Sequence, residues 1–356
     1  MNFSVTATIF ISGSVSLLLM PLLIKLFSKK NIVDRIDSRK VHKYNIPTMG
    51  GMGIFFAFIL TVLLLGSFDQ IAAHRLELFT LALMFVVGLR DDLIEFKPIS
   101  KLIAQIIPAI LLISLGDFVI LSFYNFLGIQ EIPYWFGVIL TIVLVIGLTN
   151  SYNLIDGLDG LASSFALIAS IIFGIWFYIQ DIQFYSFLAF AFSGALIGFL
   201  YFNWQPAKIF MGDTGALIIG FLFSILVVRF INFNDALPSG TFLKFNSGIG
   251  MGLSVLFIPV IDTLRVIIVR LLSKKSPLNA DKNHIHHVLL RKGLNHGQVT
   301  IVLVTLNIII VALAYLLDFW GANIVVFALI LLGIVLGIVL KYLNNDSKVI
   351  ENNASR

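Results

Sequence analysis

The sequence lacks cysteine altogether, which excludes disulfides, zinc thiolate sites and a cysteine nucleophile. It is also poor in charge, because charged residues make up 12% of the 356 residues, about half the share found in soluble domains. No polar block is long enough to fold as a separate soluble domain. Hydrophobic residues make up 59% of the chain and recur from end to end. We therefore expect one integral membrane domain over residues 1–356.

Apolar runs of roughly 17–25 residues predict an all-α, polytopic membrane fold with about eleven transmembrane helices. The first run lacks a preceding basic region and is long enough to span, so we expect a retained helix rather than a signal peptide. Pro108 and Pro259 fall inside spans and are expected to kink them. The predicted spans are residues 4–27, 49–66, 71–89, 99–116, 135–151, 161–180, 184–202, 215–233, 249–272, 299–317 and 321–342.

Lysine and arginine gather in the loops after the first, third and ninth spans, whereas the opposite side holds few. This asymmetry predicts an outer N-terminus and a cytoplasmic C-terminus. Acidic residues on the outer side, Glu77 among them, are scattered and share no motif. On the inner side, carboxylates cluster with Gly, Asn and His at loop–helix junctions. We therefore expect the chemistry on the cytoplasmic face of the plasma membrane.

The segment GLRDDLIEFKPISK, residues 88–101, places Asp91 and Asp92 at the end of the third span. A polar helix end is one explanation of this pair. However, two adjacent acids at a helix C-terminus oppose the helix dipole, and Lys or Arg would be favoured there. A functional role and a simple helix end both remain open for this segment.

The segment NSYNLIDGLDGLA, residues 150–162, has polar residues at every third position, which predicts one polar stripe on a helix. These residues are Asn150, Asn153, Asp156 and Asp159. Gly157 and Gly160 lack side-chain bulk, so a ligand could approach the backbone there. The loop contains no Lys or Arg to neutralise its two carboxylates. We expect a divalent cation or a partner from another loop, with a polar capping loop as the alternative.

The segment IFMGDTGAL, residues 209–217, places Asp213 directly before the eighth span. Its position suits an N-cap, and it suits a metal ligand equally. Phe210 lies close by on a polar loop, where it could stack on a base. An aromatic residue at the membrane interface is the commoner explanation.

Two basic segments offer sites for phosphate. In DKNHIHHVLLRKGL, residues 281–294, the cluster of His284, His286 and His287 fits phosphate better than zinc, because Asp281 is the only nearby acid. Arg265 on the preceding helix could join this cluster or reach lipid head groups. In RKVHKYNIPTMGG, residues 39–51, basic residues including Lys43 could bind phosphate or set the topology.

The sequence contains no Walker loop, dinucleotide fingerprint or serine nucleophile elbow. The inner face instead combines acids, bases and hydrogen-bonding loops. This combination suits phosphoryl transfer, in which carboxylates hold Mg²⁺ and cations offset phosphate charge.

Together the segments DD, NxxNxxDGxDGLA, FMGDTG and HIHH resemble the polyprenyl-phosphate N-acetylhexosamine-1-phosphate transferase family, which also includes the phospho-MurNAc-pentapeptide translocase. The match runs over residues 39–294, in the same order. The resemblance implies that undecaprenyl phosphate attacks the β-phosphorus of a UDP-sugar and releases UMP. Its implied partners are a UDP-N-acetylhexosamine, undecaprenyl phosphate and membrane lipid, with no nucleic acid, and a homodimer is a possible assembly.

The resemblance also implies residue roles. Asp213 and Asp156 would hold Mg²⁺, for which Mn²⁺ could substitute. Asp91 and Asp92 would face the reacting phosphates and the lipid acceptor, as further members of a catalytic set with Asp156 and Asp159. The implied substrate-binding residues are Asn153, Gly157, Phe210, Lys43, His284, His286, His287 and Arg265.

Direct in-line attack is expected rather than a phospho-aspartate intermediate, because a phosphate monoester has a second pKa near 6 and is already ionised at neutral pH. Asp92 as base or orienter of the acceptor is a hypothesis. The spaced HIHH and the eleventh span resemble the GlcNAc-1-phosphate transferase branch. The MurNAc-pentapeptide branch shows three contiguous histidines and ten spans.

Two other classes compete with this reading. A CDP-alcohol phosphotransferase would require an Ala-Arg pair after the Asp-Gly, but Leu158 and Asp159 follow Gly157. A transporter would place charges near the bilayer midplane on broken helices, and only Asp262 and Arg265 lie in such a position. Both classes are therefore disfavoured.

Overall fold

The computed structural model describes residues 4–30, 32–34, 46–274, 276 and 283–354. The chain divides into two compact units, which are described separately below. Unit 1 comprises Met1–Ile120 and Tyr134–Phe230, and unit 2 comprises Leu121–Pro133 and Ile231–Arg356. That the whole chain forms one membrane domain stays a prediction.

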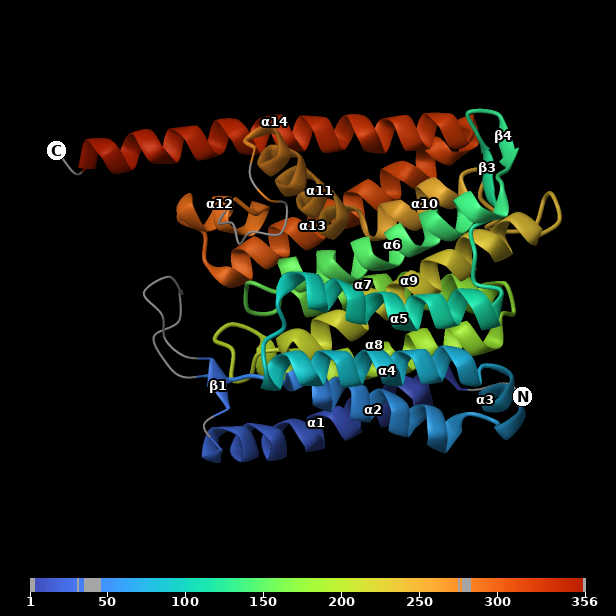
Figure 1. Ribbon diagram of the computed structural model, residues 1–356, viewed down its shortest axis with the longest axis horizontal. Coiled ribbons are helices and arrows are strands. Elements are labelled where there is room, and N and C mark those ends of the chain that lie inside the picture. The colour runs from blue at the N-terminus through green and yellow to red at the C-terminus, as the bar shows by residue number, and fades with distance from the viewer. Residues whose placement is uncertain (1–3, 31, 35–45, 275, 277–282, 355–356) are drawn as a thin grey trace. The chain divides into compact units, whose positions relative to one another are not determined.

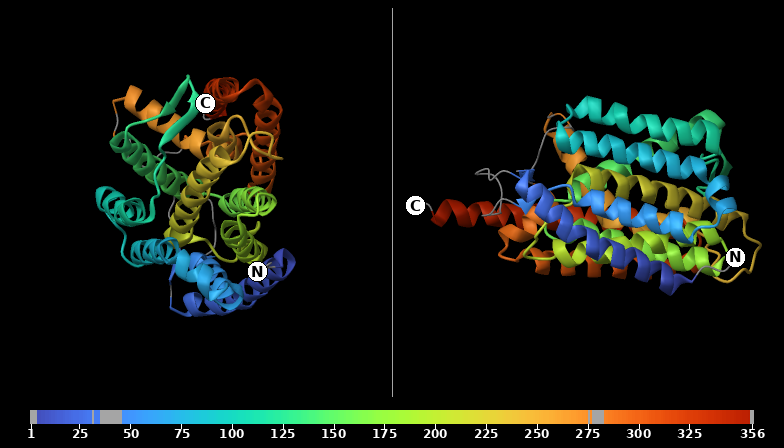
Figure 2. Two further views of the ribbon diagram at one scale, coloured as in Figure 1. Left: turned by 90° about the vertical axis from the view of Figure 1, so that its right-hand side faces the viewer. Right: turned by 90° about the horizontal axis from the view of Figure 1, so that it is seen from below.

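Unit 1 is a bundle of helices that lie alongside one another (Figure 1 and the right-hand view of Figure 2). Its helices are α1 (Val5–Lys29), α2 (Gly50–Leu65), α3 (Phe68–Ala73), α4 (Arg75–Leu93), α5 (Pro98–Gly116), α6 (Tyr134–Ile155), α7 (Leu161–Ile179), α8 (Gln183–Asn203) and α9 (Gly212–Ala236), of which α9 continues into unit 2. A short antiparallel pair, β1 (Val33–Asp34) and β2 (Ile46–Pro47), precedes α2.

The core of unit 1 depends on small residues. Gly194 and Gly198 form a GxxxG motif on α8, and a Cβ on Gly194 would lie 2.5 Å from the carbonyl oxygen of Ile9 on α1. The Ser12 and Ser16 hydroxyls of α1 donate to the Ala191 and Ala195 carbonyls of α8, the second at 2.8 Å. Small residues let membrane helices approach closely, so α1 and α8 pack through their backbones.

Unit 2 follows the same helical pattern with a second small hairpin. Its elements are β3 (Ser122–Phe126), β4 (Ile129–Glu131), the end of α9, α10 (Gly248–Val255), α11 (Phe257–Leu272), α12 (Ile285–Arg291), α13 (His296–Leu317), η1 (Asp318–Trp320) and α14 (Ala322–Ala354). Strands β3 and β4 pair antiparallel, with Ser122 opposite Glu131.

The predicted span over residues 249–272 is interrupted at Leu256, between α10 and α11. Pro259 has no N–H to donate to the Val255 carbonyl, so a continuous helix would leave that oxygen without its partner. The Asn307 side chain of α13 fills the gap: its amide donates to Val255 O at 3.0 Å, and its oxygen accepts the Ile258 N–H at 3.0 Å. A side chain from another helix thus satisfies the broken backbone.

Within the described residues, eight helices are long and apolar enough to cross a membrane. They are α1, α5, α6, α7, α8, α9, α13 with the turn after it, and α14. Helix α2 is shorter, α4 carries charges at both ends, and α10 and α11 are separate pieces. The prediction of a helical, multi-pass membrane protein is confirmed, while the count of eleven spans and the orientation stay predictions.

Candidate active site

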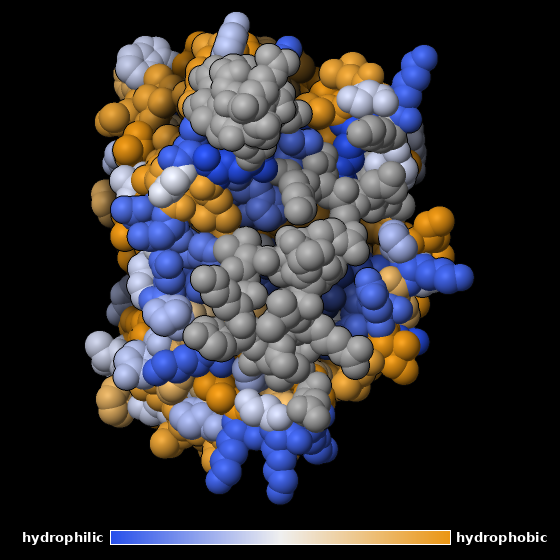
Figure 3. Space-filling view, turned by 90° about the vertical axis from the view of Figure 1, so that its left-hand side faces the viewer, coloured by the Kyte–Doolittle hydropathy of each residue, from blue (hydrophilic) through white to orange (hydrophobic). Residues whose placement is uncertain are grey.

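The site in unit 1 forms where the end of α4 meets the start of α9. A Cβ on Gly88 of α4 would lie 2.6 Å from the Cα of Thr214 on α9, so only glycine allows this approach. Glu77 near the start of α4 contacts Arg229 near the end of α9, so the two helices run antiparallel. Figure 3 views the molecule from the side where α4 ends and shows hydrophilic residues gathered on that face.

Asp92 caps α9 from outside that helix. Its Oδ1 accepts the Asp213 N–H at 2.7 Å, and its Oδ2 accepts the Thr214 N–H at 3.0 Å together with the Thr214 hydroxyl. Gly212 has φ +76°, and a Cβ there would lie 2.8 Å from both Asp92 oxygens. The carboxylate therefore sits at the positive end of the α9 dipole. The alternative that Asp213 is the N-cap of this helix is wrong, because Asp92 takes that role.

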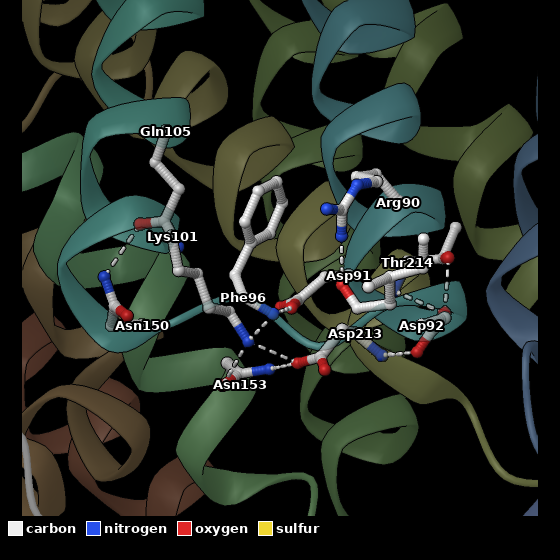
Figure 4. A network of polar contacts seen from close by, with 11 residues as sticks. Arg90, Asp91, Asp92, Phe96, Lys101, Gln105, Asn150, Asn153, Asp213 and Thr214 are labelled. Atoms are coloured by element: carbon white, nitrogen blue, oxygen red, sulfur yellow. Dashed lines mark hydrogen bonds and ion pairs between the residues drawn. The ribbon is translucent and has the colours of Figure 1, made fainter.

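Lys101 of α5 binds the acids together (Figure 4). Its Nζ lies 2.8 Å from Asp91 Oδ2, 2.5 Å from Asp213 Oδ1 and 3.2 Å from Asn153 Oδ1. The Asn153 amide also donates to Asp213 Oδ1. The contacts to Asp213 and Asn153 are hydrogen bonds, and the contact to Asp91 is an ion pair.

The sequence analysis missed Lys101, which it counted among residues that set the topology. The sequence did indicate that such a partner was needed, because the acidic segment over residues 150–162 contains no Lys or Arg. Its carboxylates therefore required a cation or a partner from another segment. Asp91 is fixed further by accepting the Phe96 N–H at 2.6 Å, which closes the turn between α4 and α5. The Lys101–Asp91 ion pair therefore holds the start of α5 against the end of α4.

Helices α5 and α6 are held in register one turn deeper in the bundle. The Asn150 amide donates to Gln105 Oε1 at 2.8 Å and to the Ile146 carbonyl at 2.8 Å. Asn150 lies one turn before Asn153 on α6, and Gln105 lies one turn after Lys101 on α5. This contact therefore aligns the two helices so that Lys101 and Asn153 meet at their ends (Figure 4).

The predicted polar stripe over residues 150–159 is wrong in part, because α6 ends at Ile155. Asp156 and Asp159 lie in the turn that follows, and Gly160 begins α7 with φ +73°. Burial, together with the neighbouring carboxylates of Asp213, Asp92 and Asp159, raises the pKa of Asp156 to about 8. The structure therefore brings Asp156 into the field of the other acids.

Asp159 and Asn203 hold the loop before Asp213. Asp159 is buried, and its Oδ2 accepts the Ala207 N–H at 3.1 Å. The Asn203 oxygen accepts the Gly160 N–H at 3.1 Å, and its amide donates to the Ile209 carbonyl at 2.9 Å. Asn203 was missed by the sequence analysis, since nothing near it in the sequence marks it. The predicted catalytic role of Asp159 stays a prediction beside this structural one.

The Phe210 backbone joins this loop to the start of α2. Its N–H donates to the Pro47 carbonyl at 2.8 Å, and its carbonyl accepts the Gly50 N–H at 2.8 Å. The Phe210 side chain is half-buried and Gly157 is exposed. Lys43 lies outside the described residues. The proposed contacts of these residues with substrate stay predictions.

In unit 2, His284 and Arg265 meet at Asp262. His284 Nδ1 lies 2.8 Å from Asp262 Oδ2, and Arg265 Nη2 lies 2.8 Å from Asp262 Oδ1. His286 is buried with its ring parallel to that of His284, 5.7 Å away, and burial lowers its pKa to about 3. His286 is therefore neutral at pH 7, while His287 is half-buried beside it.

The acids of unit 1 suit a magnesium ion that is completed by substrate. Across the described part of the chain, no group of three or more His, Asp or Glu side chains is placed to hold a metal. Mg²⁺, however, commonly binds one or two carboxylates together with substrate phosphates and water. Asp156 and Asp213 would supply such carboxylates, and the pKa of Asp156 is raised by burial and, after that, by the neighbouring acids Asp213, Asp92 and Asp159.

The sequence of this chain matches the model of the glycosyl transferase family 4 over residues 75–231, which include α4 and most of α9. The chain is 31% identical over 322 residues to a probable undecaprenyl-phosphate N-acetylglucosaminyl 1-phosphate transferase of Bacillus subtilis, covering 88% of this chain and 86% of that protein. The chain belongs to the glycosyl transferase family 4.

Other members of the family differ in the named acceptor and sugar. A decaprenyl-phosphate N-acetylglucosaminephosphotransferase of Mycolicibacterium smegmatis is 28% identical over 284 residues, which cover 74% of this chain and 70% of that protein. A phospho-N-acetylmuramoyl-pentapeptide-transferase of Listeria innocua is 34% identical over 222 residues, which cover 57% of this chain and 67% of that protein. The match to the Bacillus subtilis protein therefore extends over more of the chain than the match to the Listeria protein.

Proposed function

We propose that this protein transfers GlcNAc 1-phosphate from UDP-GlcNAc to undecaprenyl phosphate. A phosphate oxygen of the acceptor forms a bond to the β-phosphorus of the donor. The bond between this phosphorus and the oxygen that bridges to the α-phosphate breaks, and UMP leaves with that oxygen. The product is a lipid-linked sugar diphosphate, which begins the synthesis of a glycan such as O-antigen or teichoic acid.

The observation that carries this proposal is the meeting of acidic and amide side chains from three separate segments. Asp91 and Asp92 end α4, Asn153 ends α6, and Asp213 begins α9, yet Lys101 and Asp92 connect them through hydrogen bonds to Asn153 and Asp213 and an ion pair to Asp91. A polar helix end would need no such convergence. The Bacillus subtilis and Mycolicibacterium smegmatis relatives are named as transferases of this sugar phosphate.

The main physical obstacle to this reaction is the repulsion between two anionic substrates. The acceptor phosphate is largely ionised at neutral pH and needs no strong base. Lys101 places a cation among the acids, and its contacts to Asp91 and Asp213 fix its position. We therefore propose direct in-line attack, without a phospho-aspartate intermediate.

The acids have two different proposed roles: two would hold the metal ion, and two would fix the position of neighbouring side chains. Asp213 and Asp156 would hold Mg²⁺, which supplies charge neutralisation at the diphosphate when it is bound. Asp92 has both oxygens engaged by the start of α9, so its first role is to fix Asp213 rather than to take a proton. Asp91 in turn fixes Lys101.

We further propose eleven spans, with the N-terminus outside and both the site and the C-terminus on the cytoplasmic side of the plasma membrane. The lysine and arginine asymmetry of the loops supports this orientation. The absence of native cysteine makes the test direct, because single cysteines can be introduced without background labelling. We expect membrane-impermeant maleimide to label cysteine at Lys208 only from the cytoplasmic side, and cysteine at Asp235 only from outside. The reverse pattern would refute the orientation.

The reaction is tested with purified protein, undecaprenyl phosphate, Mg²⁺ and a set of UDP-sugars, with UMP and lipid product measured together. We expect both products with UDP-GlcNAc and neither with UDP-MurNAc-pentapeptide. Product with the pentapeptide donor alone would instead place the protein with the Listeria relative. Uptake of the sugar into proteoliposomes without UMP release would indicate a transporter and overturn the proposal.

A further inference from the structure

The start of α2 is buried against the loop that precedes α9, and the proposed reaction assigns it no task. Just before α2, the Pro47 carbonyl accepts the Phe210 N–H of that loop at 2.8 Å. The Gly50 N–H then donates to the Phe210 carbonyl at 2.8 Å, and the Gly51 N–H donates to the Met211 carbonyl at 2.8 Å. The first N–H groups of a helix have no partner within it, so the backbone of the loop caps α2.

The two glycines at the start of α2 allow its backbone to touch the backbone of α9 and of the loop. A Cβ on Gly51 would lie 2.1 Å from the nitrogen of Gly215 and 2.9 Å from the carbonyl carbon of Thr214, both in the first turn of α9. A Cβ on Gly50 would lie 2.8 Å from the carbonyl oxygen of Phe210. Backbone atoms cannot turn aside as the end of a side chain can, so a methyl group at Gly51 would displace the first turn of α9.

Met49, the residue directly before α2, has an unfavourable backbone conformation that the surrounding contacts maintain. It is 2% exposed and has φ 73°, in the left-handed region that residues other than glycine rarely adopt. Such a conformation persists only where the surrounding structure fixes it. Met49 turns the chain into α2 immediately before Gly50 and Gly51. The start of α2 is therefore a fixed support for the loop and for α9.

Two helices hold the first turn of α9 through separate contacts. Helix α4 holds it through Asp92, which accepts the Asp213 and Thr214 N–H groups. Helix α2 holds it through the backbone of Gly51, which lies against Gly215. The contact with α2 involves no charge and no side chain, so it depends only on how closely the two backbones approach. Both contacts fix the place from which the Asp213 carboxylate projects.

We propose that Gly51 is a positioning residue, whose bare backbone sets the first turn of α9 and thereby the Asp213 carboxylate at the distance that transfer requires. This inference rests on the proposed function, since Asp213 is a proposed magnesium ligand. Gly51 has no side chain to offer to a ligand and acts through the backbone of α9. A glycine that serves close packing alone would change only stability. A positioning glycine also changes how turnover depends on Mg²⁺.

The experiment compares Gly51→Ala with Gly53→Ala in the full-length protein. Gly53 is the matched control on the same helix, because a Cβ there would meet the flexible end of the Met20 side chain at 2.5 Å rather than backbone. The added methyl of Gly51→Ala requires α9 to retreat by about 1 Å, and a misplacement of that size can lower turnover about a hundred-fold.

We expect Gly51→Ala to lower kcat per folded molecule by about that factor and to raise the Mg²⁺ concentration that gives half-maximal rate. KM for UDP-GlcNAc should change less than kcat. Gly53→Ala should keep the kcat and the Mg²⁺ dependence of the parent. If Gly51→Ala had the turnover of the control, or lost turnover with an unchanged Mg²⁺ dependence, the inference would be overturned.

Amide hydrogen exchange tests the same contact without metal, substrate or turnover. In the unmodified protein we expect slow exchange at Gly50 and Gly51, because both N–H groups are bonded to the loop. Exchange over residues 209–215 should become faster in Gly51→Ala and stay unchanged in Gly53→Ala. Fast exchange at Gly50 and Gly51 in the unmodified protein would refute the inference even if Gly51→Ala fails to fold. If the unmodified protein makes no lipid product, the proposed function fails, but the exchange result still decides whether α2 fixes the first turn of α9.

Discussion

The two ends of the α4–α9 pair solve the same problem of buried charge in different ways. At one end, Glu77 of α4 accepts from Arg229 of α9 at 3.0 Å and from the Tyr185 hydroxyl at 2.9 Å, and Glu77 is 5% exposed. Arg229 also donates to the Gly116 carbonyl at 3.0 Å. One acid thus meets one base, with the Tyr185 hydroxyl and the Gly116 carbonyl as further partners. This end is closed.

At the other end the acids outnumber their base. Asp91 and Asp213 share the single ammonium of Lys101, and no ion pair to Asp92 or Asp156 occurs within the described ranges. The Asp213 side chain remains 31% exposed. A purely structural network would have balanced its charge as the Glu77 end does. Surplus carboxylate beside partial exposure therefore marks the end at which an ionic ligand is expected.

Substitution of Asp213 gives the largest expected effect and the clearest test of the difference between the two ends of the α4–α9 pair. We expect Asp213→Asn to lower turnover on the order of a thousand-fold, because the proposed metal loses a charged ligand. Thermal stability in detergent should stay close to that of the parent, since asparagine still accepts from Lys101. The control is Asp117→Asn, at an exposed position whose φ of 45° asparagine tolerates. Equal turnover in the two variants would remove Asp213 from the site.

The opposite pattern is expected at the closed end. Glu77→Gln leaves the Arg229 guanidinium without its charged partner, which should cost about 3 kcal/mol of stability. Turnover per folded molecule should remain that of the parent, because no substrate contact is assigned there. Differential scanning calorimetry and the transfer assay measure the two quantities, with exposed Asp69→Asn as control. A Glu77→Gln variant that is stable but inactive would contradict the division between the two ends.

In unit 2 a neutral side chain, Asn307, stabilises the structure. It sharpens the comparison between the two ends of the α4–α9 pair, because it acts without charge. Asn307→Leu removes the partners of the Val255 carbonyl and the Ile258 N–H and should lower stability by about 2 kcal/mol. Thermal unfolding measures the loss. Asn323→Leu is a milder control, because Asn323 contacts the Leu127 N–H in an exposed position. If the two variants had equal midpoints of thermal unfolding, water would already provide hydrogen-bond partners for the Val255 carbonyl and the Ile258 N–H.

A further expected effect depends on pH. In the unfolded chain Asp156 has a pKa near 3.8, and in the folded protein its pKa is about 8. The folded protein therefore binds more protons between these values, and the stabilising contribution is lost as pH rises through about 8. Asp156→Asn should match the parent at pH 4 and exceed its melting temperature increasingly toward pH 8, measured without divalent metal. If the parent were more stable than Asp156→Asn at pH 8, Asp156 would not be destabilised by burial and the neighbouring acids.

Sequence patterns predicted that the acidic segments meet but not how the acids are held. The segments around Asp92, Asp156 and Asp213 were each incomplete without a partner, so their meeting could be expected. Lys101 could not be selected in advance, because the packing of α5 against α6 decides which lysine reaches Asp91 and Asp213. The end of α6 could have been predicted from the local sequence, because Gly157 and Gly160 interrupt the polar stripe that was expected to continue after Asn153.

Partners far apart in the sequence were the ones that sequence reasoning missed. Asn307 lies 49 residues beyond the Ile258 N–H that it accepts, although Pro259 announced that a backbone partner would be needed. Glu77 belongs to no shared motif among the predicted outer acids, and its ion pair with Arg229 was not predicted. Neither partner carries a motif, so only the three-dimensional packing could identify it.

The central claim is that the converging acids support the transfer of a phospho-sugar, and the β-phosphorus of the donor tests it most directly. UDP-GlcNAc labelled at that atom is incubated with undecaprenyl phosphate, Mg²⁺ and the protein, beside Asp213→Asn. The account predicts that the label appears in the lipid and that the released nucleotide is unlabelled UMP. Label released as UDP, or label in the lipid that is undiminished with Asp213→Asn, would contradict it.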